Sequence, residues 1–354
     1  MRLAIPRETH PGENRASVTP DTVKKLVRLG ADLAIESGAG AGAGFSDEAY
    51  AAEGASVVTD RDALLGSADM VLRLRKPELD EIAKLKSGCI HVSYLDPFNE
   101  HALIREFAAK SITAVSMEMI PRSTRSQKMD ALSSQANLAG YMAVMLAATR
   151  LPRIFPMMMT PAGTLKPSKV FIIGAGVAGL QAIATAKRLG ARVTAFDTRP
   201  VVAEQVQSLG GKFLEIDLGD TGQTADGYAR ELTPEQVEIQ RQAQKAVIAD
   251  SDVVITTAQV FGRKPPVLVT ADMVAGMAPG SVVVDMAAET GGNVEGSVPD
   301  EVVDVGGVTI VGTGNLANLV ARDATQMYAS NMFNLVEDTW DKETGAFVLD
   351  MEND

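Results

Sequence analysis

Val170-Phe171-Ile172-Ile173-Gly174-Ala175-Gly176-Val177-Ala178-Gly179-Leu180 is the stretch from which the architecture of this chain can be read. Its apolar run ends in the pattern GxGxxG, and an alanine-rich segment with helical character, Gln181–Leu189, follows. A second apolar run, Arg192–Phe196, ends in Asp197. A strand, a tight turn, a helix and a second strand with an acidic end are the parts of a dinucleotide-binding unit.

Each residue type in this unit has a physical task. Gly174 permits the tight turn, Gly176 lets backbone N–H groups approach a pyrophosphate at the helix N-terminus, and Gly179 allows helix and strand to pack closely. Asp197 would accept hydrogen bonds from the adenosine ribose and repel a 2′-phosphate, whereas Arg199 could attract one, so we expect NAD(H) rather than NADP(H). The cofactor-binding residues predicted here are Gly174, Gly176, Val177, Ala178, Gly179, Asp197, Thr198, Arg199 and Ala258.

The composition limits the possible functions. The 354 residues are 46% hydrophobic and 22% charged, which is typical of a soluble globular protein with room for two domains. A net charge of −12 argues against a nucleic-acid surface. A single cysteine, Cys89, excludes an internal disulfide and suits a reducing compartment, and three scattered histidines predict no metal site. No apolar run approaches the ~20 residues that span a bilayer, so direct membrane insertion is not expected.

The order of the segments predicts an α/β fold class with two Rossmann-like, doubly wound domains, mainly parallel sheets and long connecting helices. Residues 1–120 alternate strand-like and helix-like segments, and valine- and isoleucine-rich runs recur between residues 170 and 311. A helix at Arg322–Val336 can return the chain to its first domain. The predicted domains are therefore a discontinuous one, residues 1–130 with 322–354, and a nucleotide-binding one, residues 131–321.

Three other segments allow more than one interpretation. The Gly/Ala run Ser37–Gly44 is expected to be a flexible connection rather than a second phosphate loop, because no long helix follows it. Met157–Met159 are expected to pack in a core, followed by a turn at Thr160–Thr164. The polar residues 121–137, before a helix at Leu138–Thr149, are expected to form either a ligand-contacting loop or a solvated one.

Several segments, in order along the chain, resemble the NAD(H)-binding component (alpha subunit, domain I) of proton-translocating NAD(P) transhydrogenase. They are Arg7-Glu8 with Gly12–Pro20, Met119–Tyr141, Gly174–Gly190 and Val284–Asn293. The sister family, alanine dehydrogenase, shares both domains. Where those dehydrogenases have a substrate-binding lysine and a catalytic histidine, this chain has Arg75 and Asp96, which leaves no evident proton acceptor for amino-acid oxidation. Arg15, a substrate contact there, is retained, and we expect it to form a salt bridge within its domain.

The resemblance implies an NAD(P)+ transhydrogenase, in which hydride passes between NADH on this chain and NADP+ on a partner subunit. Such a transfer needs positioning and exclusion of water rather than an acid. By the same resemblance, Arg122 contacts NAD(H), Gln127 reaches the nicotinamide ribose, and Asp130 and Ser133 hold the carboxamide; Arg122, Gln127 and Asp130 are the implied catalytic positions. Tyr228 would belong to a mobile loop that closes over the nucleotide.

The implied partners are an NADP(H)-binding component, a membrane-spanning component that translocates protons, and a second copy of this chain. The implied location is the cytoplasmic face of the inner membrane, reached through those subunits. Two alternatives stay open on the residues alone: an alanine or related amino-acid dehydrogenase with an atypical acid, and a non-catalytic NAD-binding module.

Overall fold

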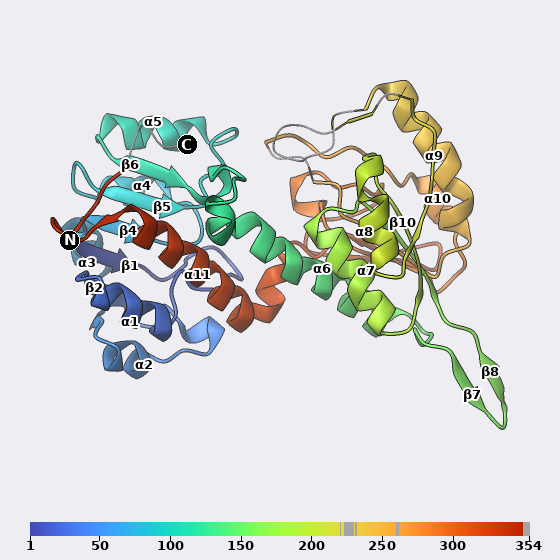
Figure 1. The fold of residues 1–354 in the computed structure, drawn as a ribbon, viewed down its shortest axis with the longest axis horizontal. Coiled ribbons are helices and arrows are strands. Elements are labelled where there is room, and N and C mark those ends of the chain that lie inside the picture. Colours follow the sequence, from blue (N-terminus) through green and yellow to red (C-terminus); the bar gives the residue numbers. More distant parts are fainter. Residues whose placement is uncertain (220, 223–229, 231, 260–261, 350–354) are drawn as a thin grey trace. The chain divides into compact units, whose positions relative to one another are not determined.

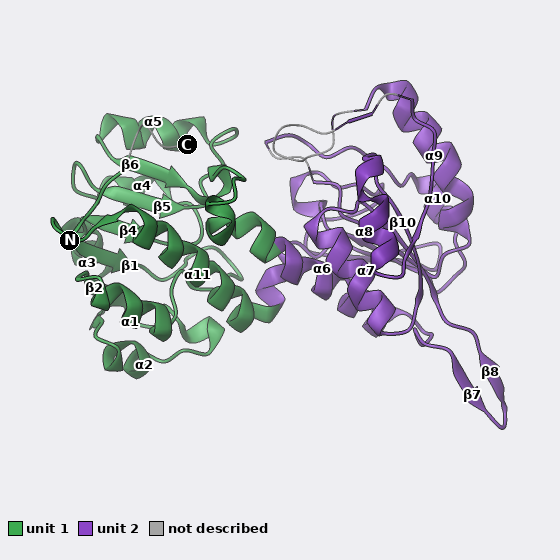
Figure 2. Cartoon of the chain, viewed as in Figure 1, with its two compact units in different colours: residues 1–135, 320–354 green, residues 136–319 purple. Residues whose placement is uncertain are grey.

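The chain folds as two compact units, residues 1–135 with 320–354 (unit 1) and residues 136–319 (unit 2; Figure 2). The computed structural model describes residues 1–219, 221–222, 230, 232–259 and 262–349. The predicted changes of domain lie after residue 130 and before residue 322. Both units contain a mainly parallel sheet between helices, so the predicted α/β fold class is confirmed.

Unit 1 is built on a six-stranded sheet with the order β3-β2-β1-β4-β5-β6 (Figure 1). Every neighbouring pair is parallel. The strands are β1 (Arg2–Ile5), β2 (Asp32–Glu36), β3 (Ser56–Val58), β4 (Met70–Leu72), β5 (Ile90–Ser93) and β6 (Thr113–Ser116). The helices are α1 (Pro20–Arg28), α2 (Asp47–Ala52), α3 (Arg61–Ser67), α4 (Leu79–Ile82), α5 (His101–Ala109) and α11 (Ala321–Thr339). A short ribbon, β16 (Trp340–Asp341) with β17 (Ala346–Phe347), follows α11.

Alternation along the strands divides unit 1 into two cores. Leu3 and Ile5 of β1 pack in the core that contains α1 and α11, while Ala4 packs in the core that contains α3, α4 and α5. Successive side chains of a strand point to opposite faces of a sheet, so one strand serves both cores.

Unit 2 repeats this plan in a seven-stranded sheet with the order β11-β10-β9-β12-β13-β15-β14, in which only the β14–β15 pair is antiparallel. The strands are β9 (Lys169–Ile173), β10 (Arg192–Phe196), β11 (Lys212–Phe213), β12 (Val253–Thr256), β13 (Val282–Asp285), β14 (Val302–Val305) and β15 (Val308–Val311). The helices are α6 (Ala131–Arg150), which begins in unit 1, α7 (Val177–Arg188), α8 (Ala203–Ser208), α9 (Pro234–Ala249) and α10 (Ala271–Ala275). One core lies beneath α6 and α7, and another beneath α9 and α10.

Helix α6 begins seven residues earlier than the sequence suggested, at Ala131 instead of Leu138. The Asp130 Oδ1 atom accepts the N–H group of Ser133 at 2.8 Å, which is the hydrogen bond of an N-cap. A cap of this kind lets a polar segment start a helix, so part of the predicted polar loop is the first turn of α6.

The Gly/Ala run is packed rather than flexible. It contains a 3-10 turn, η1 (Ala41–Ala43), and both Ala39 and Ala43 are buried. A side chain at Gly42 would begin 2.6 Å from the backbone oxygen of Asn14. Glycine is therefore needed here for close packing, which a sequence pattern alone does not separate from flexibility.

The methionine prediction is wrong. Met157–Met159 lead into a two-stranded hairpin, β7 (Met158–Thr160) with β8 (Gly163–Leu165), which extends away from the rest of unit 2 (Figure 1). The three methionines are exposed, Met159 to 73%. The predicted turn is present between the two strands. Three apolar residues in a row are typical of a buried strand, but they do not reveal whether anything covers it.

Candidate dinucleotide-binding site

The glycine turn joins β9 to α7 in unit 2. Gly174 has a φ of +103°, which favours glycine, and a side chain at Gly179 would begin 1.9 Å from the Gly174 carbonyl oxygen. A side chain at Gly176 would meet no heavy atom within 4 Å. Gly174 and Gly179 are thus required by the fold itself, whereas Gly176 keeps space open beside the start of α7.

The start of α7 is suited to an anion. Gly176 is its N-cap and supplies no side-chain hydrogen bond, so the first N–H groups of the helix are left for another acceptor. Val177 and Ala178 form the first turn, and Val177 is 36% exposed. Exposed N–H groups and the positive end of the helix dipole together favour a phosphate.

Asp197 follows β10 and is tied to the glycine turn. Its Oδ2 atom accepts the Ala175 N–H at 2.7 Å. Arg199 lies over the same carboxylate, with Nε 2.9 Å from Oδ1 and Nη2 2.9 Å from Oδ2. The hydrogen bond to Asp197 raises the pKa of Arg199 against the effect of burial. A ribose that uses Asp197 must therefore share it with Arg199. Thr198, between them, accepts the Thr221 hydroxyl through its carbonyl at 2.8 Å.

Ala258 is held by residues to which the sequence analysis gave no role. The Asn293 Nδ2 atom donates to the Ala258 carbonyl at 3.0 Å and to the Pro266 carbonyl at 2.8 Å. Asn293 is in turn fixed by Asp285, a fully buried carboxylate at the end of β13, whose Oδ2 accepts the Asn293 N–H at 3.0 Å and the Val294 N–H at 3.2 Å. An acidic residue at the end of a valine run followed by Gly-Gly-Asn was the signal available in the sequence.

In unit 1 the structure brings Arg122, Asp130 and Ser133 together. The Ser133 hydroxyl donates to Asp130 Oδ2 at 2.6 Å, and Arg122 Nε lies 3.6 Å from the same oxygen. Gln127 is exposed in the 3-10 turn η3 (Ser126–Met129), and its carbonyl accepts the Asp130 N–H at 3.3 Å. A carboxylate that accepts and a hydroxyl that can still accept match the hydrogen-bonding groups of a carboxamide.

Residues of α11 fix this loop, and the sequence analysis did not find them. The side-chain amides of Asn331 and Asn334 both donate to the Lys128 carbonyl at 2.9 Å. Asp338 pairs with Arg125 at 2.8 Å and with Lys128 at 3.2 Å. These partners lie about 200 residues after the loop, at separations that short-range patterns do not reach.

Arg15 forms the predicted salt bridge within its domain. Two of its nitrogens donate to Glu13 at 2.7 Å each, and Nη1 donates to Gln135 at 2.8 Å. Arg75 Nε also donates to Glu13, at 2.9 Å. Burial raises the pKa of Glu13, but the two arginines outweigh it and lower that pKa to about 2. Glu13 is therefore ionised at every physiological pH.

Unit 1 offers no ready imidazole for amino-acid oxidation at the sheet. Asp96, at the position of the dehydrogenases' histidine, accepts from the Asn99 side chain at 2.9 Å. His91 of β5 is 1% exposed, and burial, with a smaller contribution from Arg73, lowers its pKa to about 3. A neutral, enclosed imidazole is a poor general base for an external substrate.

The predicted site residues are thus divided between the units. Those of the glycine turn, Asp197, Thr198, Arg199 and Ala258 belong to unit 2; Arg122, Gln127, Asp130 and Ser133 belong to unit 1; and Tyr228 lies outside the described residues. Within the described ranges, no group of three or more His, Cys, Asp or Glu side chains could hold a metal ion. The same part of the chain contains no helix long and apolar enough to cross a membrane.

Comparison with known proteins identifies the class. Residues 4–139 match the N-terminal domain, and residues 143–354 the C-terminal domain, of the family described as alanine dehydrogenase/PNT. The chain therefore belongs to the alanine dehydrogenase/PNT family.

Within this family the chain is more similar to the transhydrogenase alpha subunits than to the alanine dehydrogenases. It is 44% identical to an NAD(P) transhydrogenase subunit alpha of Rhodospirillum rubrum, over 100% of this chain and 94% of that protein. A crystal structure of transhydrogenase from Sinorhizobium meliloti matches with a TM-score of 0.86 and 43% identity, over 98% of this chain and 96% of that one. Alanine dehydrogenase of Halomonas elongata is 30% identical over 92% of this chain and 84% of that protein.

Proposed function

We propose that this chain binds NADH and passes hydride directly to NADP+ held by a partner subunit of a proton-translocating NAD(P) transhydrogenase. The observation that carries the nucleotide assignment is the Asp197 carboxylate, 2.7 Å from the Ala175 N–H and therefore fixed beside the glycine turn. A carboxylate in that place accepts from a ribose diol and repels a 2′-phosphate, which supports NAD(H) on this chain.

NADH supplies the hydride when it is bound; the residues of this chain bind and orient it. The first turn of α7 takes the pyrophosphate, and Asp130 and Ser133 take the carboxamide that fixes the face of the nicotinamide. Arg122, 3.6 Å from Asp130, keeps that carboxylate ionised and thus an acceptor. Gln127 is exposed and reaches the partner subunit. No proton moves at the reacting carbon, so positioning is the main contribution of these groups.

The proposal includes the partners. One subunit binds NADP(H), another spans the membrane and translocates protons, and this chain associates with itself as a homodimer. It would then lie at the cytoplasmic face of the inner membrane through those subunits. Similarity over nearly the whole length to transhydrogenase alpha subunits supports this arrangement.

Purified chain distinguishes the candidate functions. We expect it to bind NADH alone, and to transfer hydride to an NADP analogue only when the NADP(H)-binding component is added. Vigorous pyruvate-dependent oxidation of NADH by the chain alone would instead identify an amino-acid dehydrogenase. NADH binding without turnover with either acceptor would identify a non-catalytic module.

Gln127→Asn tests the role of one residue. We expect NADH affinity to change less than about twofold and the rate of hydride transfer to fall about tenfold or more, because an interaction at the subunit contact acts on transfer rather than on binding. Gln242→Asn, a matched change on exposed α9, should leave both unchanged. Weaker NADH binding at an unaltered transfer rate would remove Gln127 from this role.

A further inference from the structure

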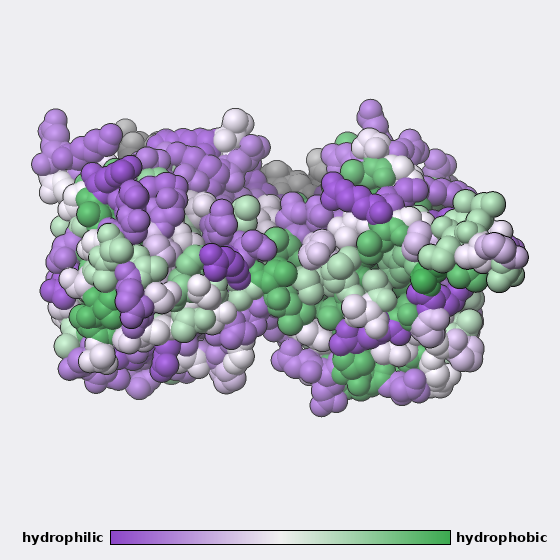
Figure 3. All heavy atoms as spheres, turned by 90° about the horizontal axis from the view of Figure 1, so that it is seen from below, coloured by the Kyte–Doolittle hydropathy of each residue, from purple (hydrophilic) through white to green (hydrophobic). Residues whose placement is uncertain are grey.

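The β7–β8 hairpin presents an unusual amount of apolar surface. Met157, Met158, Met159 and Leu165 are exposed to 60%, 45%, 73% and 54%, and Ile154 just before the hairpin is exposed to 36%. Figure 3 shows apolar surface at the right-hand end of the molecule, where this hairpin lies. A group of large apolar side chains within a dozen residues marks a contact surface more often than free solvent.

The hairpin also lacks support of its own. β7 and β8 pair only with each other, and neither joins the main sheet of unit 2 in the part of the chain that the structure describes. A separate two-stranded hairpin is marginally stable in water, and its outer edges present backbone groups that can pair with another strand. Something that packs against these edges would stabilise it.

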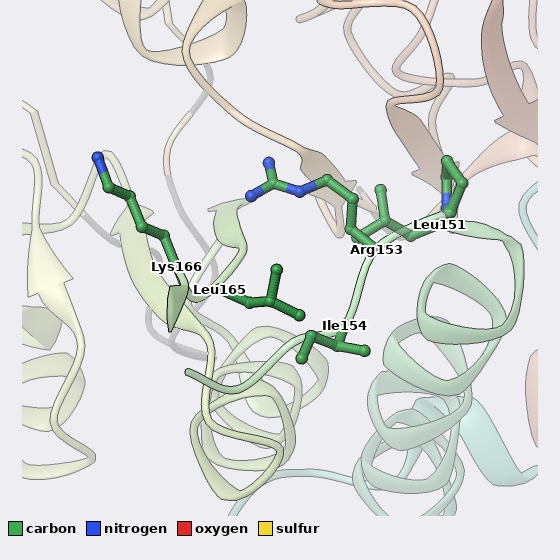
Figure 4. Close-up of a pocket in the computed structure, with 6 residues that line it drawn as sticks. Leu151, Arg153, Ile154, Leu165 and Lys166 are labelled. Atoms are coloured by element: carbon green, nitrogen blue, oxygen red, sulfur yellow. The ribbon is translucent and has the colours of Figure 1, made fainter. Parts of the chain in front are cut away.

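A hollow of about 460 Å³ lies at the base of the hairpin. It is lined by Leu151, Pro152, Arg153, Ile154, Leu165 and Lys166, and Figure 4 shows Leu165 beside Ile154 within it. Methionine is flexible and fills irregular apolar gaps well. The same surface therefore offers both a projecting apolar group and a hollow that could receive one.

We propose that this hairpin surface, residues 151–166, is where a second copy of the chain binds. A patch with both a projection and a receptacle is self-complementary, as a twofold interface requires, since each copy supplies the methionines that fill the hollow of the other. The inference locates the homodimer put forward above and does not depend on the nucleotide chemistry.

Charge favours a second copy over other partners. No charged residue occurs from Ile154 to Leu165, although the whole chain carries −12. At the base, Arg153 pairs with Asp252, and Lys169 pairs with Asp250 at 2.5 Å. Two strongly acidic molecules can meet at a neutral surface without like-charge repulsion. An anionic membrane would instead require a cluster of free cations, which these pairs do not provide.

Mass measurement on the full chain tests the interface. We expect sedimentation equilibrium to show a dimer for the wild type and a monomer for Met157→Glu/Met159→Glu, with the dissociation constant raised about 100-fold or more. Ile239→Glu, an exposed apolar position on α9 of the same unit, is the matched control and should remain a dimer. A dimeric double variant, or a monomeric wild type, overturns the proposal. NADH affinity should be equal in all three, which separates this result from failure of the nucleotide assignment.

Thiol labelling provides a second measurement that needs no disruption. Burial raises the pKa of Cys89 to about 11, so an introduced cysteine is the reactive one. In a single copy, Met159 is more exposed than Ile239, 73% against 43%. In the dimer we expect Met159→Cys to react with maleimide about tenfold more slowly than Ile239→Cys; faster reaction contradicts the interface. Hairpin-dependent binding to phosphatidylserine vesicles would assign the surface to a membrane and also overturn it.

Discussion

The two units share one strand order and differ at the carboxyl ends of their strands. Unit 1 has β3-β2-β1-β4-β5-β6, and unit 2 has the corresponding β11-β10-β9-β12-β13 followed by β15 and β14. In such sheets the direction of winding changes beside the first strand, and ligands bind at that point. What each unit places there is different.

In unit 1 the point beside β1 is occupied by the chain's own charges. Glu8 follows β1, is almost fully buried, and accepts the backbone N–H groups of Leu74 and Arg75 at 2.6 and 3.2 Å. Arg73 beside it pairs with Glu81 at 2.7 Å. Side chains here satisfy the N–H groups that phosphate oxygens would otherwise satisfy.

In unit 2 the same point is lined by glycine. The turn after β9 brings Gly174 against Thr257 of the neighbouring loop, and Gly176 leaves the start of α7 open. The shared topology does not assign a function to either unit; the residues at one turn do. Four substitutions test this contrast.

Glu13→Gln in unit 1 should have the largest effect. It leaves Arg15 and Arg75 buried or half-buried with a weakened partner, so we expect about 3 kcal/mol less unfolding free energy at pH 7. Glu53→Gln, which alters only an exposed pair with Lys24, should cost less than about 1 kcal/mol. Denaturant titration measures both, and equal losses would contradict the buried network.

The same substitution should change the response to acid. The pKa of Glu13 is lowered to about 2 from 4.5 in the unfolded chain, so its contribution is complete above pH 4.5 and is lost as pH falls towards 2. Glu81, lowered to about 2 when Arg73 and Arg61 outweigh burial, loses its contribution in the same window. The variant should therefore show a shallower, though not flat, decline between these pH values.

Gly176→Ala in unit 2 should abolish tight binding without harming the fold. No atom lies within 4 Å of the added methyl group, so the melting temperature should be unchanged, while a pyrophosphate would meet the methyl group and NADH affinity should fall about 100-fold. Gly179→Ala, where the methyl group meets the Gly174 carbonyl, should impair both. Calorimetric titration with NADH, and a thermal melt of each variant, decide the matter. Normal NADH binding by Gly176→Ala would place the pyrophosphate elsewhere.

Asp197→Asn should alter the choice of nucleotide. Without the carboxylate, Arg199 is released to attract a 2′-phosphate, so we expect the preference for NADH over NADPH to fall about tenfold. Asp250→Asn, at an exposed pair with Lys169, serves as the control and should preserve the preference. Parallel titrations with both nucleotides report the ratio; an unaltered ratio would mean that Asp197 does not select.

The smallest effects are expected at two helix caps. Thr19 of α1 and Thr233 of α9 both form capping boxes, but Thr19 is buried and Thr233 is exposed. Thr19→Ala should cost about 1–2 kcal/mol and Thr233→Ala about 0.5 kcal/mol, because the buried N–H group finds no water to replace the hydroxyl. Denaturant titration of both variants checks this order, which a larger loss at Thr233 would reverse.

The sequence predicted what depends on neighbouring residues. The glycine turn, Asp197, the cap at Thr19 and most strands could be found because their signals lie within a few positions. The links from Asn331, Asn334 and Asp338 to the loop at Lys128 could not, since folding alone brings them together. The methionines were misassigned for a related reason: whether an apolar residue is covered depends on its surroundings, not on its own chemistry.

The Asp130 cap gives the proposed carboxamide site a thermodynamic consequence. The carboxylate that would accept the nicotinamide amide already holds the first turn of α6 through Ser133. A ligand that takes it over competes with the helix for one acceptor, and loss of such a cap costs about 1 kcal/mol. Cofactor affinity and the fraying of α6 are therefore coupled equilibria, and amide hydrogen exchange at Ser133 and Ser134 would report nucleotide occupancy from within the protein.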